Sequence, residues 1–311
     1  MKIIVTGGAG FLGSHVCDKL IEMGNQVVCI DNLITGSEEN IKHLQDNPNF
    51  EFINHDVVNG LPQNLTADQI YHLASPASPN KNNPKSYISF PFETMQVNTV
   101  GTWKLCEAAV SMKAKLLFAS TSEIYGDPLE HPQKEEYNGN VSTTGPRSVY
   151  DESKRFGETI VSSFTRSKGL DARIIRIFNT YGPRMDDDGR VVIELVKAAL
   201  ENRPFPVFGD GKQTRSFCYI SDMVEGIILA MDKGESESII NLGNPNEFTI
   251  LELAEKIKEL TKSSSTIEYN DFPEDDPKKR CPDITKAKLE LGWEPKINID
   301  QGLKMLIDYL A

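Results

Sequence analysis

The most constraining feature of this sequence is a glycine-rich turn close to its first residue. The apolar residues 3–5 break into Gly7, Gly10 and Gly13, spaced G-x-x-G-x-x-G, and a helical apolar pattern begins at Leu12. Between a strand and a helix, such glycines allow a tight turn, let the backbone approach a pyrophosphate, and point the helix N-terminus at the phosphates. A glycine pattern alone is weak, but this one has an expected strand before it and an expected helix after it. The turn therefore predicts a dinucleotide-binding α/β fold.

Asp31 makes this prediction more specific. It ends the next expected strand, residues 26–30, and follows Gly13 by 18 residues. A carboxylate at this strand tip can accept hydrogen bonds from the adenosine ribose and would repel a 2′-phosphate, which favours NAD over NADP. A helix or turn cap is the structural alternative for the same side chain.

Strands and helices alternate over the first half of the chain. Apolar or alternating runs predict strands at residues 2–5, 26–30, 50–53, 69–74, 115–119 and 174–178, and helices at 98–110 and 150–167. This alternation of strands and helices predicts a doubly wound parallel sheet. Later in the chain, the pattern changes to helices near 192–202, 221–232 and 249–262 with short strands. We therefore expect residues 1–179, completed by later segments, to bind the dinucleotide, and residues 180–311 to form a smaller mixed α/β domain.

A tyrosine and a lysine four residues apart form the candidate reaction centre. On a helix, Tyr150 and Lys154 share one face, so the ammonium can lie near the phenol and lower the phenol's pKa toward neutrality. A phenolate so placed can take a proton from a sugar hydroxyl while a nicotinamide takes a hydride. A surface contact is the alternative for an isolated pair of this kind. Thr121, Ser122 and Glu123 leave a strand at its carboxyl end, where ligands of parallel sheets bind, and so can meet the same substrate.

Composition and charge argue against several other classes. The 311-residue chain carries a net charge of -12, which disfavours binding to nucleic acid or to an anionic membrane. Its five cysteines lack C-x-x-C spacing and its five histidines lack metal-ligand spacing, so we expect reduced thiols and no metal. No apolar run reaches a membrane-spanning length, and the strand at residues 2–5 leaves no room for a signal peptide. We therefore expect a cytoplasmic protein.

An acidic protein that binds a nucleotide sugar needs local cations. Arg215 lies within residues 213–217, and Lys278, Lys279 and Arg280 form a basic run. Such cations suit a diphosphate and a charged sugar, although the residues alone favour a solvated loop for the basic run. Asp56, at another strand end, could contact the adenine or serve as a turn acid. Residues 80–93, rich in Asn, Pro and aromatic residues, predict a long loop that lines or covers a site.

With these features in order, the chain resembles the extended short-chain dehydrogenase/reductase family that acts on nucleotide sugars, and within it the members that decarboxylate UDP-glucuronate. The similarity extends over nearly the whole chain, through the blocks HLASPASP (72–79), TSEIYGDP (121–128), YDE (150–152), NTYGPRM (179–185), QTR (213–215), NLGNP (241–245), residues 275–283 and LGWEP (291–295). So many blocks are far more specific than the glycines alone. The resemblance implies a Rossmann-type doubly wound parallel sheet with a smaller C-terminal substrate-binding domain.

The resemblance also implies roles for named residues. Catalysis would fall to Tyr150 as base at the sugar 4-hydroxyl, Lys154 as its partner, Thr121 as a hydrogen-bond partner of that hydroxyl, Ser122 and Glu123 near the carboxylate and C5, and Arg280 as a donor or charge stabiliser. The cofactor would be NAD, held by Gly7, Gly10, Phe11, Leu12, Gly13, Asp31, Asn32, Asp56, Val57, Leu73, Ala74, Asn98, Tyr150 and Lys154. The UDP-sugar would be held by Asn179, Arg184, Val191, Arg215, Tyr219 and Arg280. For Arg280, this reverses the preference for a solvated loop.

The implied activity is that of a carboxy-lyase which converts UDP-glucuronate to UDP-xylose. Oxidation at C4 places the C6 carboxylate β to a ketone, so carbon dioxide leaves without a metal, C5 gains a proton and C4 is reduced again. Arg280 is always charged, and so it suits stabilisation of an enolate better than proton donation. The family likeness of the helices near 98–110 and 150–167 further implies a homodimer.

Other activities on the same fold remain open. The segment between Pro79 and Asn98 is longer than the family pattern suggests and adds Tyr87, Phe90 and Phe92, which leaves the exact nucleotide sugar undecided. A 4,6-dehydratase of the dTDP-glucose type would need an acid where Ser122 stands, and a 4-epimerase needs no carboxylate at position 123. A non-catalytic dinucleotide-binding regulator is the alternative of another class.

Overall fold

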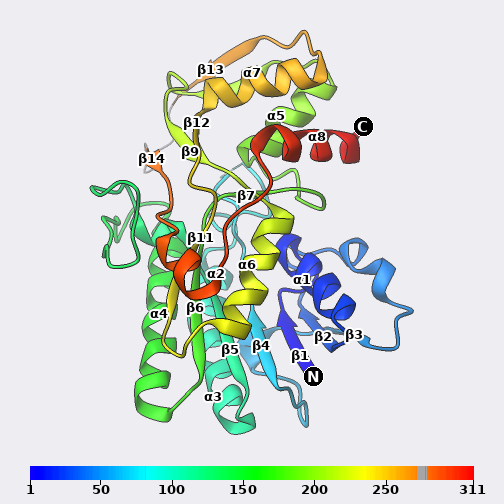
Figure 1. Ribbon diagram of the computed structural model, residues 1–311, viewed down its shortest axis with the longest axis vertical. Helices are drawn as coiled ribbons and strands as arrows, with labels where there is room; N and C mark the ends of the chain where they lie inside the picture. The colour runs from blue at the N-terminus through cyan, green and yellow to red at the C-terminus, as the bar shows by residue number, and fades with distance from the viewer. Residues whose placement is uncertain (81, 272–276, 278) are drawn as a thin grey trace.

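The computed structural model describes residues 1–80, 82–271, 277 and 279–311. Across these residues the largest sheet has seven parallel strands in the order β11-β6-β5-β4-β1-β2-β3 (Figure 1). The strands are β1 (Lys2–Thr6), β2 (Gln26–Asp31), β3 (Phe50–Asn54), β4 (Gln69–His72), β5 (Lys115–Thr121), β6 (Ala172–Ile177) and β11 (Ile239–Leu242). The doubly wound parallel sheet expected from the sequence is confirmed.

Helices cover both faces of this sheet because its strands are apolar on both sides. Along β5, Leu117 packs into one buried cluster with residues of α1 (Phe11–Glu22) and α6 (Ile220–Lys233). Its neighbours Leu116 and Phe118 pack into a second cluster with α3 (Thr102–Met112) and α4 (Ser148–Lys168). Since successive side chains of a strand point to opposite faces, the apolar run of β5 holds both helical layers (Figure 1).

The strand order locates the crevice where a ligand can bind. β1 pairs with β2 on one side and with β4 on the other. The chain runs outward from β1 through β2 to β3 and then crosses back to β4, so the strand order reverses at β1. At such a switch point, the loops after the strands separate and open a crevice at the carboxyl ends. The edge strand β11 comes from after residue 179, so a later segment does complete the sheet. The boundary between residues 1–179 and 180–311 as two domains stays a prediction.

The remaining described segments form short sheets and helices at one end of the large sheet (Figure 1). The short strands pair as β7 (Thr180–Tyr181) with β10 (Cys218–Tyr219), β9 (Thr214–Ser216) with β12 (Glu247–Thr249) and β14 (Lys279–Arg280), and β8 (Phe205–Phe208) with β13 (Ile267–Asn270). The helices are α5 (Val191–Leu200), α7 (Ile250–Thr261) and α8 (Ile299–Leu310). The helices expected at 192–202, 221–232 and 249–262 thus form within two residues of their predicted ends.

The helix expected at 98–110 is longer and less regular than its sequence pattern suggests. It begins as α2 (Pro91–Gln96), passes through the π-helical turn η4 (Val97–Gly101) and continues as α3. Short helical turns complete the chain: η1 (Glu38–Asn40), η2 (Lys42–Leu44), η3 (Val57–Asn59), η5 (Ser122–Tyr125) and η6 (Ala287–Leu291). Within the described part of the chain, no helix has the length and apolar character needed to cross a bilayer.

Candidate active site

The glycine-rich turn between β1 and α1 has the geometry that its sequence predicts. Gly7 has a φ of +74°, and a Cβ atom added to it would lie 2.6 Å from the backbone of Ala74. A Cβ atom at Gly13 would lie 2.0 Å from the carbonyl oxygen of Gly7. A side chain at either position would therefore break the turn. Because both residues are glycines, the backbone of the turn faces the pocket uncovered, as binding of a pyrophosphate requires.

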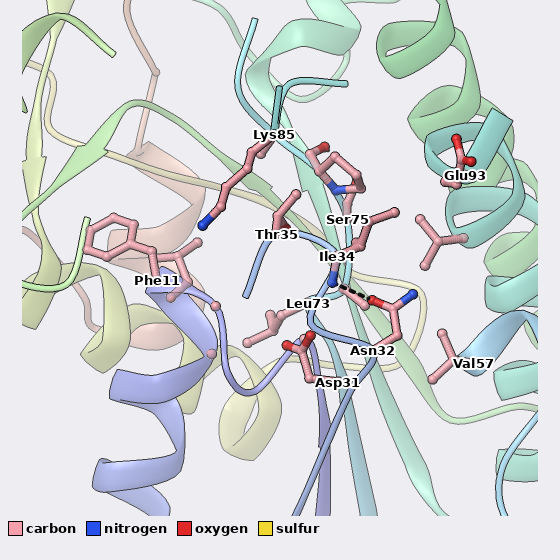
Figure 2. Close-up of a pocket in the computed structure, with 18 of the residues that line it drawn as sticks. Phe11, Asp31, Asn32, Ile34, Thr35, Val57, Leu73, Ser75, Lys85 and Glu93 are labelled. Atoms are coloured by element: carbon pink, nitrogen blue, oxygen red, sulfur yellow. Dashed lines mark hydrogen bonds between the residues drawn. The ribbon is translucent and has the colours of Figure 1, made fainter. Parts of the chain in front are cut away.

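A pocket lies over this turn at the carboxyl ends of the strands. Among its lining residues are the predicted NAD ligands Gly7, Gly10, Phe11, Leu12, Gly13, Asp31, Asn32, Asp56, Val57, Leu73 and Ala74. Figure 2 shows Asp31, Val57 and Leu73 around this pocket, with the side chain of Lys85 reaching toward Phe11. The glycine-rich turn and the side chains that line the pocket together fit a dinucleotide.

Asp31 both shapes the turn and faces the pocket. Its Oδ2 accepts a hydrogen bond from the Ala9 amide at 3.0 Å and its Oδ1 accepts one from the Leu33 amide at 2.8 Å. Burial raises the pKa of Asp31, and these two amide hydrogen bonds act against that rise. The carboxylate is thus tied to the glycine-rich turn after β1 and to the loop after β2 while it lines the pocket. It has the cap role in these turns, and its contact with a ribose stays a prediction.

Asp56 has the turn role that the sequence left open. Its Oδ1 accepts a hydrogen bond from the Val58 amide at 2.9 Å, which caps η3, and its Oδ2 accepts one from the side chain of Asn32 at 3.2 Å. Both residues line the pocket as well. Contact of Asp56 with an adenine stays a prediction.

Asn98 does not line this pocket. It is fully buried in the π-helical turn η4, and its side-chain amide donates a hydrogen bond to Ser153 Oγ on α4 at 3.0 Å. This contact joins the two helices beside Lys154, so any effect of Asn98 on a cofactor would act through the position of α4. Its assignment as a cofactor ligand stays a prediction.

Two cationic side chains that sequence reasoning missed face the pocket. Lys85 comes from the long segment after β4, and Arg190 precedes α5 and lies over the Phe11 ring at 5.6 Å. Lys85 Nζ also pairs with Asp186 at 3.3 Å, which joins the segment to the loop before α5. No motif marked either residue, because both approach the glycine turn only through tertiary folding.

The candidate reaction centre lies where β5 ends against α4. Tyr150 and Lys154 are both buried on α4, and the Tyr150 hydroxyl hydrogen-bonds Thr121, the last residue of β5. Lys154 Nζ donates a hydrogen bond to the Ala119 carbonyl at 2.8 Å and lies 5.8 Å from the centre of the Tyr150 ring. The structure therefore brings Tyr150, Lys154 and Thr121 together, as the sequence predicts.

The expected pKa of the Tyr150 phenol is wrong. Burial raises the pKa of Tyr150 well above its ordinary value, and the charges of Glu123 and Asp151 add to the rise. The Thr121 hydrogen bond and the charge of Arg190 act against it. Burial also lowers the pKa of Lys154 to about 7. The reason is geometric: the ammonium is bonded to the strand carbonyl at the face of the ring, and both groups have lost water that would stabilise their charged forms.

Glu123 is held between two arginines. Arg280 donates to both of its carboxylate oxygens, at 2.5 and 2.6 Å, and Arg147 Nη2 donates at 2.7 Å. The two guanidinium groups outweigh the effect of burial and hold the pKa of Glu123 at about 2. Arg280 is buried and belongs to β14, so the solvated-loop interpretation of its run is wrong for this residue. Lys278, Asp275 and Asp276 lie outside the described residues.

Arg147 is a site residue that sequence reasoning did not identify. It immediately precedes α4 and is buried, three positions before Tyr150. A basic residue at a helix N-terminus is unfavourable by itself, and this could have indicated a partner elsewhere in the fold. Ser122, by contrast, was predicted and is buried beside Glu123 in η5.

Tyr87 lies directly on the candidate base. Its ring stacks on the Tyr150 ring with centroids 4.9 Å apart and planes 4° from parallel. Tyr87 is 1% exposed, and its hydroxyl has no hydrogen-bond partner among the described residues. The long segment after β4 thus covers the phenol through this residue, in line with the expectation of a covering loop.

The predicted substrate-binding residues are spread along the small sheets. Arg215 is buried on β9 and its backbone pairs with that of Arg280 on β14. Arg184 pairs with Asp18 of α1 at 2.7 Å, and Tyr219 packs edge-on against Tyr181 in the core. Asn179 lies half-buried between β6 and β7, and Val191 begins α5. The assignment of all five to a nucleotide stays a prediction.

One group of described residues has atom types that bind metals. The ligand atoms of His131, Glu247 and Cys281 all lie within 4.8 Å of one another. His131 and Glu247 already pair at 2.8 Å, and the Cys281 thiol donates to the Pro245 carbonyl at 3.2 Å. Because each atom has a protein partner, this group gives no reason to add a metal, and the absence of one stays a prediction.

Comparison with known proteins places the chain among sugar-nucleotide enzymes. The model of the NAD dependent epimerase/dehydratase family matches residues 3–243. UDP-glucuronic acid decarboxylase 1 of Arabidopsis thaliana is 53% identical over 308 residues, which cover 99% of this chain and 69% of that protein. UDP-glucuronic acid decarboxylase 1 of Danio rerio is 48% identical over 311 residues, 100% of this chain and 72% of that protein.

A solved structure supports the same placement. The UDP-glucuronic acid 4-epimerase of Bacillus cereus, in complex with UDP-glucuronic acid and NAD, superimposes with a TM-score of 0.88 at 31% identity. The alignment covers 100% of this chain and 99% of that one.

Proposed function

The chain belongs to the NAD dependent epimerase/dehydratase family, and we propose that it decarboxylates UDP-glucuronate to UDP-xylose with NAD as its cofactor. The observation that carries this proposal is the 48–53% identity to UDP-glucuronic acid decarboxylases over nearly the whole chain. Identity to the 4-epimerase that binds the same uronic acid is only 31%. This difference favours loss of the carboxyl group over simple epimerisation.

The first step in this proposal belongs to Tyr150. Its phenolate would take the proton of the sugar 4-hydroxyl, while Thr121 hydrogen-bonds at the same point. When bound, NAD supplies the acceptor for the C4 hydride and a positive charge that favours the phenolate. Burial of Tyr150 opposes ionisation of the phenol, and the Thr121 hydrogen bond favours it. Lys154, fixed to the Ala119 carbonyl, would hold the cofactor ribose beside Tyr150.

The arginines around Glu123 suit the second step. Arg147 and Arg280 both donate to the carboxylate of Glu123, so their positive charge gathers around one acidic side chain in a buried place. This charge would attract the substrate carboxylate and then stabilise the enolate that remains when carbon dioxide leaves. An arginine side chain does not lose its proton at neutral pH, so the contribution of Arg147 and Arg280 is electrostatic.

We also propose that two copies of the chain pair through α3 and α4. Trp103 on α3 is 49% exposed and Phe156 on α4 is 54% exposed, and the two helices lie side by side in Figure 1. Large exposed apolar side chains on two neighbouring helices are typical of an interface, and a two-fold axis would bury each residue against the partner copy. Val100 on η4 adds a further exposed apolar side chain.

A cytoplasmic location completes the proposal. The five cysteines are all free and buried thiols. Unpaired cysteines are typical of a reducing compartment.

The direct test is to incubate the purified protein with UDP-glucuronate labelled at C6 and with NAD. We expect labelled carbon dioxide and a UDP-pentose in equal amounts, identified by mass spectrometry and NMR. Formation of UDP-galacturonate without carbon dioxide would instead establish a 4-epimerase. Turnover of dTDP-glucose to a 4-keto-6-deoxy sugar would establish a dehydratase.

A further inference from the structure

After decarboxylation, C5 of the sugar must receive a proton, and three of the side chains around the site cannot supply it. Glu123 is ionised because two arginines hold its pKa at about 2. The proton that Tyr150 takes from the 4-hydroxyl must return to O4 in the last step, so it is not available at C5. Burial raises the pKa of the Tyr87 phenol far above neutrality, which makes it a poor donor. None of these three described side chains therefore holds a proton that it can give to C5.

Asp151 is a buried carboxyl group that the steps above do not use. It follows Tyr150 on α4 and is 6% exposed. Its Oδ1 is buried and meets no hydrogen-bond partner anywhere in the described ranges. A buried polar atom without a partner costs free energy, so its retention calls for an explanation. A substrate that reaches this atom would provide one.

Among the described residues, the charged groups that influence Asp151 come from several different segments. They are Glu123 on η5, Arg147 before α4, Arg280 on β14 and Glu152 on α4 itself. Burial is the main cause that raises the pKa of Asp151, to about 8, and Glu123 adds to the rise while the arginines act against it. The carboxyl group is therefore mostly protonated at neutral pH and has a proton to give. The phenols of Tyr87 and Tyr150 are the other titratable groups close enough to be influenced by it.

We propose that Asp151 is the acid that protonates C5 after carbon dioxide has left. This inference rests on the proposed decarboxylase function. The electron pair of the C5–C6 bond first enters the enolate, with its negative charge on O4. As the C4 ketone forms again, C5 takes the proton from the Asp151 carboxyl group, which becomes a carboxylate beside Arg147 and Arg280. Solvent then returns a proton to Asp151, so each turnover consumes one proton and releases one carbon dioxide.

A fixed position of Asp151 would make the protonation of C5 stereospecific. C5 keeps its original hydrogen and gains one from solvent, and a single fixed donor that approaches from one side decides which of the two positions the new hydrogen takes. Turnover in D2O should therefore place deuterium in one stereochemical position, which NMR of the UDP-pentose resolves.

The test compares Asp151→Asn with the wild type and with the control Glu152→Gln. Asparagine matches the shape of a protonated aspartate but cannot donate a comparable proton. Glu152 is the next residue on α4, and its loss removes a charge from a half-exposed pair with Arg155 at 3.5 Å. We expect Asp151→Asn to lower steady-state turnover by about 10²–10⁴-fold. The release of carbon dioxide in a single turnover should stay within about threefold of wild type, because decarboxylation precedes the affected step.

Two further measurements separate an acid from a merely structural residue. With Asp151→Asn, deuterium at C5 should lose its stereochemical preference. The fall in activity above pH 8 that we expect for wild type should be absent from this variant. Glu152→Gln should retain the preference and also the fall in activity at high pH. That fall should lie at a slightly lower pH, because the charge of Glu152 is the smallest of the influences that raise the pKa of Asp151. Calorimetric UDP affinity and the thermal midpoint show whether Asp151→Asn is folded. If this variant is not folded, the deuterium and pH results on the wild-type protein still test the proposal.

Several results would overturn the inference. Wild-type turnover of Asp151→Asn with unchanged deuterium placement would exclude Asp151 as the donor. Equal losses in carbon dioxide release and in turnover would assign it a positioning role instead. Failure of the wild type to release carbon dioxide from UDP-glucuronate would remove the proposed function itself, and this outcome is distinguishable because it precedes any comparison of variants.

Discussion

Arg280 and Glu123 form a two-pronged ion pair across 157 residues of the chain, with N–O distances of 2.5 and 2.6 Å. Glu123 follows the strand β5 of the large sheet, whereas Arg280 belongs to β14 of a small sheet. The pair therefore ties the small sheets to the carboxyl edge of the large one, directly beside the proposed base. Its bidentate geometry fixes both side chains more firmly than a single contact would.

Replacing Glu123 tests how much its ion pair with Arg280 contributes to the stability of the fold. Glu123→Gln should lower the free energy of unfolding by about 3–5 kcal/mol, because it leaves buried arginine charge without compensation. The depressed pKa of Glu123, about 2 against an ordinary 4.5, means that its stabilising effect is complete above pH 4.5 and is lost as the pH falls toward 2. Thermal melts from pH 2 to 7 should show a smaller acid dependence in the variant. An unchanged dependence would mean that other carboxylates control acid unfolding.

Tyr87 offers a test of a buried hydroxyl without a partner. Tyr87→Phe should raise the free energy of unfolding by about 1 kcal/mol, since it removes an unsatisfied buried group. Tyr87→Ala should lower it by about 3–5 kcal/mol, because the stacked ring over Tyr150 is lost. Chemical denaturation of the substrate-free protein measures both. Destabilisation by the phenylalanine variant would show that the hydroxyl has a partner.

Tyr150→Phe tests the proposed base. Removing the hydroxyl should lower turnover of UDP-glucuronate by at least 10²–10⁴-fold, the usual range for a general base, with UDP binding nearly unchanged. Tyr309→Phe is a suitable control because Tyr309 is exposed on α8. Residual activity close to wild type in Tyr150→Phe would contradict the proposed first step.

Asp31 should control the choice of cofactor. In Asp31→Asn, one of the amides of Ala9 and Leu33 loses its acceptor, and the charge that repels a 2′-phosphate is gone. We expect NAD affinity to fall about 10–100-fold, equivalent to about 1.4–2.8 kcal/mol, and the preference for NAD over NADP to narrow. Calorimetric titrations with the two dinucleotides measure this ratio. Equal ratios in the variant and the wild type would remove Asp31 as the discriminating residue.

The proposed pairing of two copies can be tested on α3. Trp103→Glu should convert the protein to a monomer by light scattering, because two charges would face each other across the two-fold axis. Leu289→Glu is the control, since Leu289 is an exposed apolar residue on η6. A wild-type mass that already corresponds to one chain would disprove the pairing.

Local patterns in the sequence accounted for much of the fold and part of the site. The glycine turn and the strand run before it predicted the dinucleotide pocket, because a tight turn and an apolar strand depend on neighbouring residues. Tyr150 and Lys154 were recognisable from their helical spacing together with the glycine turn and the residues that end β5. Arg147 and Tyr87 were not assigned roles, because their function depends on contacts with Glu123 and Tyr150 that no local spacing encodes.

By itself, the sequence determined the parallel sheet, the pocket over the glycine turn and the residues that end β5, since strand periodicity and turn chemistry act over a few residues. Only the tertiary structure decided which protons these residues hold. Burial raises the pKa of Tyr150 and of Asp151 and lowers that of Lys154, while two distant arginines keep Glu123 ionised. The physical reason is that a pKa depends on lost water and on nearby charges, and both are set when segments far apart in the chain close around the site.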